Sequence, residues 1–153
     1  MLVDQDPEEV PDRLDSALRA LVPKRLDDVI KYHRQYFQLR LSTDLEIFDL
    51  YITISPAQPK DIIDDWNLIT FVTPDFSAMW LLGEVRRKGC PRITSDVIGI
   101  DLNNGFLTTR SGSLYELGKQ KNGPPSREET FLVCASFHKT ALGIALGVPH
   151  FLL

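Results

Sequence analysis

The sequence predicts an α+β fold, with two N-terminal helices, an antiparallel sheet of about five strands and one C-terminal helix. Apolar residues recur at helical spacing near the two ends of the chain, whereas the middle shows the alternation and the short apolar runs that are typical of strands. Because the expected strands follow one another without intervening helices, an antiparallel sheet is favoured over a parallel one. The length of 153 residues suits a single domain over 1–153, and we expect residues 1–8 to be a flexible tail.

Two helices are expected before the sheet. The first covers residues 11–21, where apolar side chains recur every three or four positions and Pro11 suits the first helical turn. Pro23 interrupts this pattern. A second helix is expected over residues 24–39, with two aspartates near its positive N-terminal end. The two helices would form a hairpin or an L-shaped pair.

The central segment changes to a period of two. Residues 46–54 carry an apolar side chain at every even position from 48 onward, which predicts a strand with one apolar face. The acidic segment 61–66 is expected to form a short helical turn, and the continuously apolar residues 68–72 a buried strand. Residues 78–87 fit either a helix or a strand, and Gly83 within them favours the strand.

The last third of the chain predicts a meander followed by a helix. A strand over residues 93–101 leads into Asn-Asn-Gly, a strong hairpin signal, and the chain returns over 106–110 and pairs again over 113–117. Ser126 and Glu129 match a capping box, so the last helix is expected over residues 127–142. The three final residues, Phe-Leu-Leu, are apolar. We expect them to be buried, either on their own domain or against a second copy in a homodimer.

Charge is divided unevenly along the chain. Residues 1–80 contain 15 acidic and 8 basic residues, a net charge of −7, whereas residues 81–153 carry a net charge of +3. An acidic surface is poorly suited to phosphate backbones and better suited to a basic protein surface. We therefore expect a partner to bind an acidic group that surrounds a tryptophan anchor. The residues expected there are Asp61, Asp64, Asp65 and Trp66, with Glu46 and Asp49. The alternative is a solvated acidic turn with the tryptophan in the core.

A basic cluster gives an alternative from another functional class. Arg86, Arg87, Lys88 and Arg92 lie close together in the sequence, with aromatic residues nearby. Basic side chains hold phosphates and aromatic rings stack on bases, so this cluster could bind nucleic acid.

The two cysteines give a further alternative, a small enzyme that uses Cys90 or Cys134 as a nucleophile beside a histidine. Neither cysteine lies in a catalytic motif. Cys134 and His138 would share a helix face, but a tetrahedral metal site needs two further ligands that the spacing does not supply. We therefore expect a protein without catalytic residues, metal or cofactor.

The sequence also bears on the compartment. No apolar run approaches the length of a membrane span, and the acidic N-terminus lacks the features of a secretory signal. Two cysteines are too few for a disulfide framework, so we expect reduced thiols in the cytoplasm.

One segment resembles a known group of proteins. Residues 93–118, ITSDVIGIDLNNGFLTTRSGSLYELG, are similar to a pattern in small uncharacterised proteins of phages, plasmids and integrative elements. The resemblance implies a setting in which compact acidic proteins act as stoichiometric inhibitors of host defence, such as anti-CRISPR proteins. The expected partner is then a larger protein or ribonucleoprotein assembly with a basic surface, and no membrane.

Overall fold

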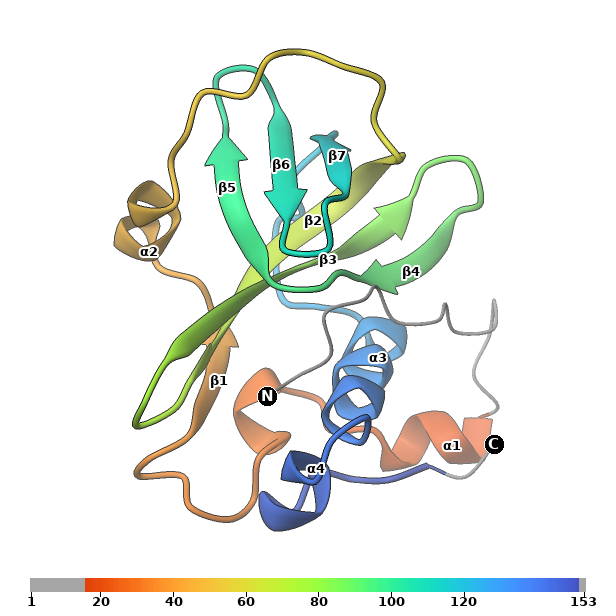
Figure 1. Ribbon diagram of the computed structural model, residues 1–153. Coiled ribbons are helices and arrows are strands. Elements are labelled where there is room, and N and C mark those ends of the chain that lie inside the picture. Colours follow the sequence, from red (N-terminus) through yellow and green to blue (C-terminus); the bar gives the residue numbers. More distant parts are fainter. Residues whose placement is uncertain (1–15, 152–153) are drawn as a thin grey trace.

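Two long strands cross the middle of the molecule and organise the rest of it. The computed structural model describes residues 16–151 (Figure 1). β2 (Asp61–Val72) and β3 (Ser77–Val85) pair as an antiparallel hairpin, with most helices below them and a group of short strands above them in Figure 1. The helices are α1 (Ser16–Leu21), α2 (Asp44–Asp49), α3 (Arg127–Phe137) and α4 (Leu142–Ala145), with the 3₁₀ turn η1 (Leu26–Asp28). The other strands are β1 (Gln38–Leu41), β4 (Cys90–Ile93), β5 (Val97–Asp101), β6 (Phe106–Thr109) and β7 (Leu114–Leu117).

The sheet has the order β4-β3-β2-β7-β6-β5, and β1 also pairs with β2. β3 occupies one edge of β2. The other edge is shared, because β7 pairs with residues 61–63 and β1 with residues 69–72. The β2–β7 pairing is parallel and the other pairings are antiparallel. A bulge between Asp64 and Asn67, with Asp65 at a φ of 48°, increases the bend of β2 between its two partners.

Both faces of the β2–β3 hairpin are covered. Successive residues of a strand point to opposite faces. Ile69 and Trp80 belong to a helix-side cluster, the buried apolar residues that pack against α3, whereas Leu68 and Leu81 belong to a strand-side cluster that packs against β5, β6 and β7. Strands that are buried on both faces carry continuous apolar runs, which explains the sequences of β2 and β3.

Aromatic rings fill the centre of the helix-side cluster. Phe71 of β2 lies 4.9 Å from Phe137 of α3 and 5.9 Å from Trp80 of β3, measured between ring centroids. Full burial of a large apolar side chain contributes about 1.5–3 kcal/mol, so this group is a main source of the attachment of α3 to the sheet.

The α+β class is confirmed, but the count and the pairing differ from expectation. The sheet has seven strands, not about five, and one pair is parallel. The described residues contain four α-helices, and they are not two before and one after the sheet. Of the first expected helix, residues 16–21 form α1, and the remainder lies outside the described residues, as does the expected tail at 1–8.

The second expected helix, over residues 24–39, is wrong. The chain makes the short turn η1, runs through a loop and enters β1. His33 has a φ of 62°, which no right-handed helix accommodates. The apolar spacing nevertheless identifies buried residues correctly, since Leu26, Val29 and Ile30 all belong to the helix-side cluster. A spacing of three and four residues is compatible with a single turn followed by a bend.

The strand expected over residues 46–54 is also wrong, because residues 44–49 form α2. Thr43 caps this helix. Its hydroxyl accepts a hydrogen bond from the Glu46 N–H at 3.2 Å, and the Glu46 carboxylate accepts one from the Thr43 N–H at 2.8 Å. The capping box favours a helix here, and this preference is stronger than the preference for a strand that the alternating apolar residues indicate.

Three further boundaries are corrected. Residues 61–66 are the first half of β2 and not a helical turn, because they pair with β7 and β3. The strand expected over 93–101 is two strands, since β4 ends at Ile93 and β5 begins at Val97. The last helix ends at Phe137, and α4 follows as a separate turn.

The remaining elements are confirmed. Residues 68–72 and 78–85 are strands, β6 and β7 follow the expected hairpin, and Ser126 caps α3 through the expected capping box with Glu129. Phe151 stacks on Phe131 of α3 at 5.3 Å, so the first residue of the apolar tail packs on its own chain. The two final leucines lie outside the described residues, and a homodimer through the tail stays a prediction.

Candidate functional site

Helix α2 presents apolar side chains to solvent. Its inner residue Ile47, and Leu50 just after it, pack against the strand-side cluster. Because residues three apart share a helix face, Leu45 and Phe48 both point outward, and they are 69% and 73% exposed. Two large exposed apolar residues on one short helix are unusual unless the surface has a binding role.

A cleft of about 650 Å³ lies beside this helix and is called the α2 cleft here. Such a volume is in the range of sites that accept a small molecule or a large side chain. Its apolar lining consists of Ile47, Phe48, Tyr51, Trp66, Ile100 and Leu102. Its polar lining consists of Asp44, Asn103 and Gln120. The residues come from α2, β2, β5 and three loops, so the cleft exists only in the folded chain.

Trp66 lines the α2 cleft, but its side chain is buried and is not available as an exposed anchor for a partner. It is 6% exposed and belongs to the strand-side cluster, and its indole N–H donates to the Gly118 carbonyl at 3.0 Å. The alternative reading of the sequence, with Trp66 in the core, therefore describes its position. The exposed aromatic residues at the cleft are Phe48 and Tyr51.

The wall of the α2 cleft is fixed by hydrogen bonds to β5. The Ile100 N–H donates to the Leu50 carbonyl at 3.0 Å, and the Ile52 N–H donates to the Ile100 carbonyl at 3.1 Å. The buried carboxylate of Asp101 accepts from the Ile54 N–H at 2.9 Å, and this bond holds the pKa of Asp101 below its usual range. The cleft is thus a preformed feature of the fold.

Glu46 fixes α2 to the sheet. Its carboxylate accepts two hydrogen bonds from the Arg40 guanidinium, at 2.8 and 3.0 Å, and one from the Thr70 hydroxyl at 3.2 Å. The hydrogen bonds from Arg40 lower the pKa of Glu46 to about 2. Glu46 was expected to contact a partner, and the structure places it in contacts within the chain.

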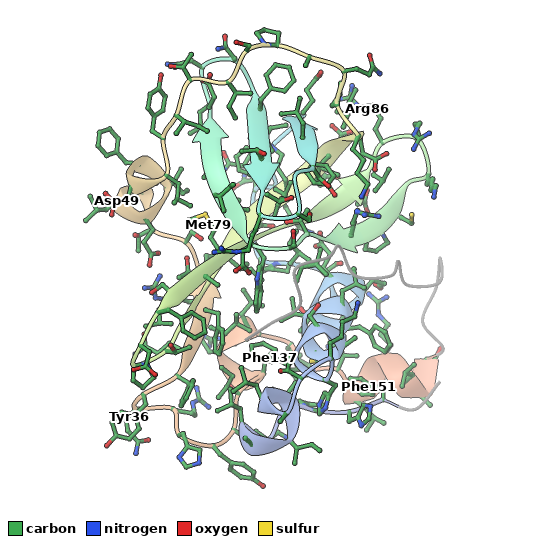
Figure 2. The ribbon with its side chains drawn as sticks, viewed as in Figure 1. Tyr36, Asp49, Met79, Arg86, Phe137 and Phe151 are labelled. Atoms are coloured by element: carbon green, nitrogen blue, oxygen red, sulfur yellow. The ribbon has the colours of Figure 1, made fainter. Side chains whose placement is uncertain are left out.

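Asp44 and Asp49 are the free carboxylates of α2. Both are exposed, and neither takes part in an ion pair within residues 16–151. Asp44 lines the α2 cleft. Asp49 lines a second hollow of about 370 Å³ on the other side of the helix, where Met79 forms part of the wall (Figure 2). The α2 surface, defined as Leu45, Phe48, Tyr51, Leu102, Asp44 and Asp49, therefore combines apolar and acidic character.

The other acidic residues expected at the site face the basic cluster. Asp64 accepts two hydrogen bonds from Arg86, both at 2.8 Å, and Asp61 accepts one from Arg87 at 2.9 Å. Arg86 holds the pKa of Asp64 below its usual range. The two surfaces that the sequence offered as alternatives therefore partly neutralise each other. In Figure 2, Asp49 and Arg86 lie on different sides of the β-layer, so the six expected residues do not form one patch.

The rest of the expected residues are more dispersed. Asp65 occupies the bulge of β2, Lys88 lies in the turn between β3 and β4, and Arg92 lies on β4. Cys134 is fully buried in α3, and burial raises the pKa of its thiol to about 12. Such a thiol forms almost no thiolate at neutral pH, which argues against Cys134 as a nucleophile. Cys90 is also buried.

The α2 surface was missed in the sequence, although a signal for it was present. Thr43 and Glu46 have the same spacing as Ser126 and Glu129, which correctly marked the start of α3. Placing a helix after Thr43 would have brought Leu45 and Phe48 onto one face. The exposure of that face depends on contacts with β5, which no local pattern contains.

Within residues 16–151, no group of three or more histidine, cysteine, aspartate or glutamate side chains could hold a metal ion. In the same residues no helix has the length and apolar character needed to cross a bilayer. Comparisons with protein-family models, with curated proteins and with solved structures gave no match.

Proposed function

We propose that this chain is a non-enzymatic binding protein that recognises a basic segment of a protein partner through the α2 surface. The observation that carries the proposal is the exposure of Leu45 and Phe48 on a helix that flanks a preformed, mostly apolar cleft. A few anchor side chains, often aromatic, that enter well-packed pockets supply most of the binding energy of protein interfaces.

Charge supports a foreign partner over a second copy. Helix α2 has three acidic residues and no basic residue, and its two unpaired carboxylates flank the apolar side chains. A symmetric dimer across α2 would bring like charges together, which destabilises an interface. A partner with lysine or arginine beside an apolar anchor would be attracted instead.

We further propose that binding itself is the activity. The partner is a larger protein or ribonucleoprotein assembly in the cytoplasm, and occupation of its basic surface inhibits it, as the resemblance of residues 93–118 implies. Cys90 and Cys134 are both buried and form no disulfide, which is compatible with a reducing compartment. Burial of Cys134, which raises the pKa of its thiol to about 12, makes it a poor candidate for the nucleophile of the cysteine-dependent enzyme.

Site-specific photo-crosslinking in the native host tests this proposal. A photoreactive phenylalanine analogue replaces Phe48 in one variant and Ile144 of α4, which is 78% exposed, in a matched control. We expect one crosslinked partner protein at position 48 and none at position 144. Reversal of Asp44 and Asp49 to lysine should remove this crosslink, because the interaction depends on charge.

Three outcomes would contradict the proposal. They are a crosslink at position 48 to a second copy of the chain, the same products at both positions, and a crosslink that is indifferent to the charge reversals. Far-ultraviolet circular dichroism of each variant confirms that α2 and the sheet are intact.

A further inference from the structure

The loop between η1 and β1 forms a second exposed surface, at the opposite end of the β-layer from β5–β7. Residues Lys31, Tyr32, His33, Arg34, Gln35 and Tyr36 are consecutive and all exposed. The two tyrosines are each 58% exposed, and Tyr36 extends from the lower edge of the molecule in Figure 2. We call residues 31–36 the tyrosine loop.

The tyrosine loop is held rigidly at its base. The N–H groups of Lys31 and Tyr32 both donate to the Leu146 carbonyl, at 2.8 and 3.0 Å, and the N–H groups of Tyr36 and Phe37 donate to the His33 carbonyl, both at 3.0 Å. These bonds fix both halves of the loop. The side chains are therefore presented to solvent from an ordered backbone, which reduces the entropy that is lost on binding.

One tyrosine packs against a glycine that the fold requires. Gly147 has a φ of 67°, and a Cβ atom at this position would lie 2.8 Å from Cε2 of Tyr32. The Tyr32 ring thus rests against the backbone after α4 and still exposes more than half of its surface. One side of the Tyr32 ring is therefore in contact with the backbone, and the rest of it is available for stacking.

The net charge of residues 31–40 is opposite in sign to the net charge of the whole chain. Residues 31–40 contain three cationic side chains and no carboxylate, whereas the whole chain has a net charge of −4. Lys31 and Arg34 make no ion pair within the described part of the chain. Arg34 lines a hollow of about 280 Å³ whose one carboxylate, Asp27, faces Arg25 at 3.2 Å.

We propose that the tyrosine loop is a binding site for single-stranded nucleic acid. Tyr32 and Tyr36 stack on bases, and Lys31 and Arg34 contact phosphates. Exposed aromatic rings between basic side chains are the combination that single strands require, because every base has a face for stacking and every linkage a charge. The loop offers no helix or ribbon for a duplex groove. This site is separate from the α2 surface and does not depend on the function proposed above.

Fluorescence anisotropy of the full chain with a labelled single strand of about twelve nucleotides, as RNA and as DNA, tests the proposal. Two phosphate contacts should make the affinity fall roughly sevenfold between about 50 and 200 mM salt. Lys31→Ala or Arg34→Ala should each reduce that fall to roughly threefold. Lys119→Ala, which removes an exposed cation near the other end of the sheet, is the matched control and should leave it unchanged.

The tyrosines are tested separately from the charges. Tyr32→Ala or Tyr36→Ala should each weaken binding about fivefold or more, whereas Tyr36→Phe should retain it, because stacking needs only the ring. Circular dichroism checks the fold of each variant.

The proposal fails if the wild-type chain does not bind the oligonucleotide, or if Lys119→Ala weakens binding as much as Arg34→Ala. A second contradicting outcome is that the chain does not bind the oligonucleotide, does bind phosphatidylserine vesicles, and loses this vesicle binding in Ile144→Asp. That result would make this end of the molecule a membrane-contacting surface.

Discussion

The carboxylate of Glu46 connects three elements of the fold. It closes the capping box of α2, pairs with Arg40 of β1 and accepts from Thr70 of β2. Because its hydrogen bonds to Arg40 favour the ionised form, its pKa is lowered to about 2 from an ordinary value of 4.5. A group with a lowered pKa stabilises the fold fully above its ordinary pKa and loses that contribution as the pH falls through the folded value.

We expect Glu46→Gln to lower the free energy of unfolding by about 2 kcal/mol at neutral pH. Glutamine retains the geometry of the capping box, so the variant isolates the loss of charge. The difference from the wild-type chain should shrink between pH 4.5 and about 2, because the unfolded chain is protonated at Glu46 over this range while the folded chain is not. Urea denaturation at pH 7 and at pH 3 measures both values. Asp49→Asn, which removes an exposed unpaired carboxylate, should have little effect, and an equal loss in both variants would contradict this account.

The bulge of β2 shows how one element serves two partners. Between Asp64 and Asn67 the strand changes its register with β3, and this lets its first residues meet β7 and its last residues meet β1. Gly83 of β3 packs directly on the bulge. A Cβ atom there would lie 2.9 Å from the Asp64 carbonyl oxygen and 3.1 Å from the Trp66 Cα, both of which are backbone atoms.

Gly83→Ala should therefore destabilise the fold by about 2 kcal/mol, since backbone atoms of a bulge cannot move aside freely. Thermal denaturation followed by circular dichroism measures the loss. Gly99→Ala is the control, because its nearest neighbour is the flexible end of the Ile52 side chain. An effect at Gly99 as large as that at Gly83 would show that the bulge is not the cause.

The elements also show which sequence signals were sufficient. The β5–β6 hairpin depends on turn residues, and the start of α3 depends on cap residues. In each case these residues are close together in the chain, so both elements could be predicted. For residues 44–49 two local signals disagree: the alternation of residues 46–54 indicates a strand, whereas the Thr43–Glu46 spacing indicates the helix that forms. The helix expected over 24–39 is wrong because His33 has a left-handed backbone, and the two residues before it donate to the distant Leu146 carbonyl.

The candidate binding surfaces were harder to predict for the same reason. The exposure of Leu45 and Phe48 results from packing of Ile47 on strands that come some fifty residues later. Likewise, the pairing of Asp64 with Arg86 follows from the β2–β3 register, which neither charge cluster encodes alone.

At the scale of the whole molecule, the two apolar clusters share the β2–β3 hairpin. The chain contains two tryptophans, and each reports on one cluster, Trp80 on the helix side and Trp66 on the strand side. Unfolding of the β2–β3 hairpin would expose both clusters to water, so the two clusters should unfold together.

Single-tryptophan variants test this cooperativity. In Trp66→Phe the fluorescence of Trp80 follows the helix-side cluster, and in Trp80→Phe that of Trp66 follows the strand-side cluster. In each variant the tryptophan transition should coincide with the loss of far-ultraviolet circular dichroism in the same urea titration. A fluorescence transition separated from the circular dichroism transition would show that one cluster unfolds independently.

The parallel pairing of β2 with β7 has a consequence for how the chain reaches its folded state. It joins residue 61 to residue 115, and the segment between them contains four other strands. Closing so long a loop costs more chain entropy than forming a hairpin, so we expect the local strand pairs to form before β7 docks on β2. The Gly118 carbonyl that orients Trp66, and Gln120 at the rim of the α2 cleft, both follow β7. We therefore expect the α2 cleft to be completed only after β7 has docked on β2.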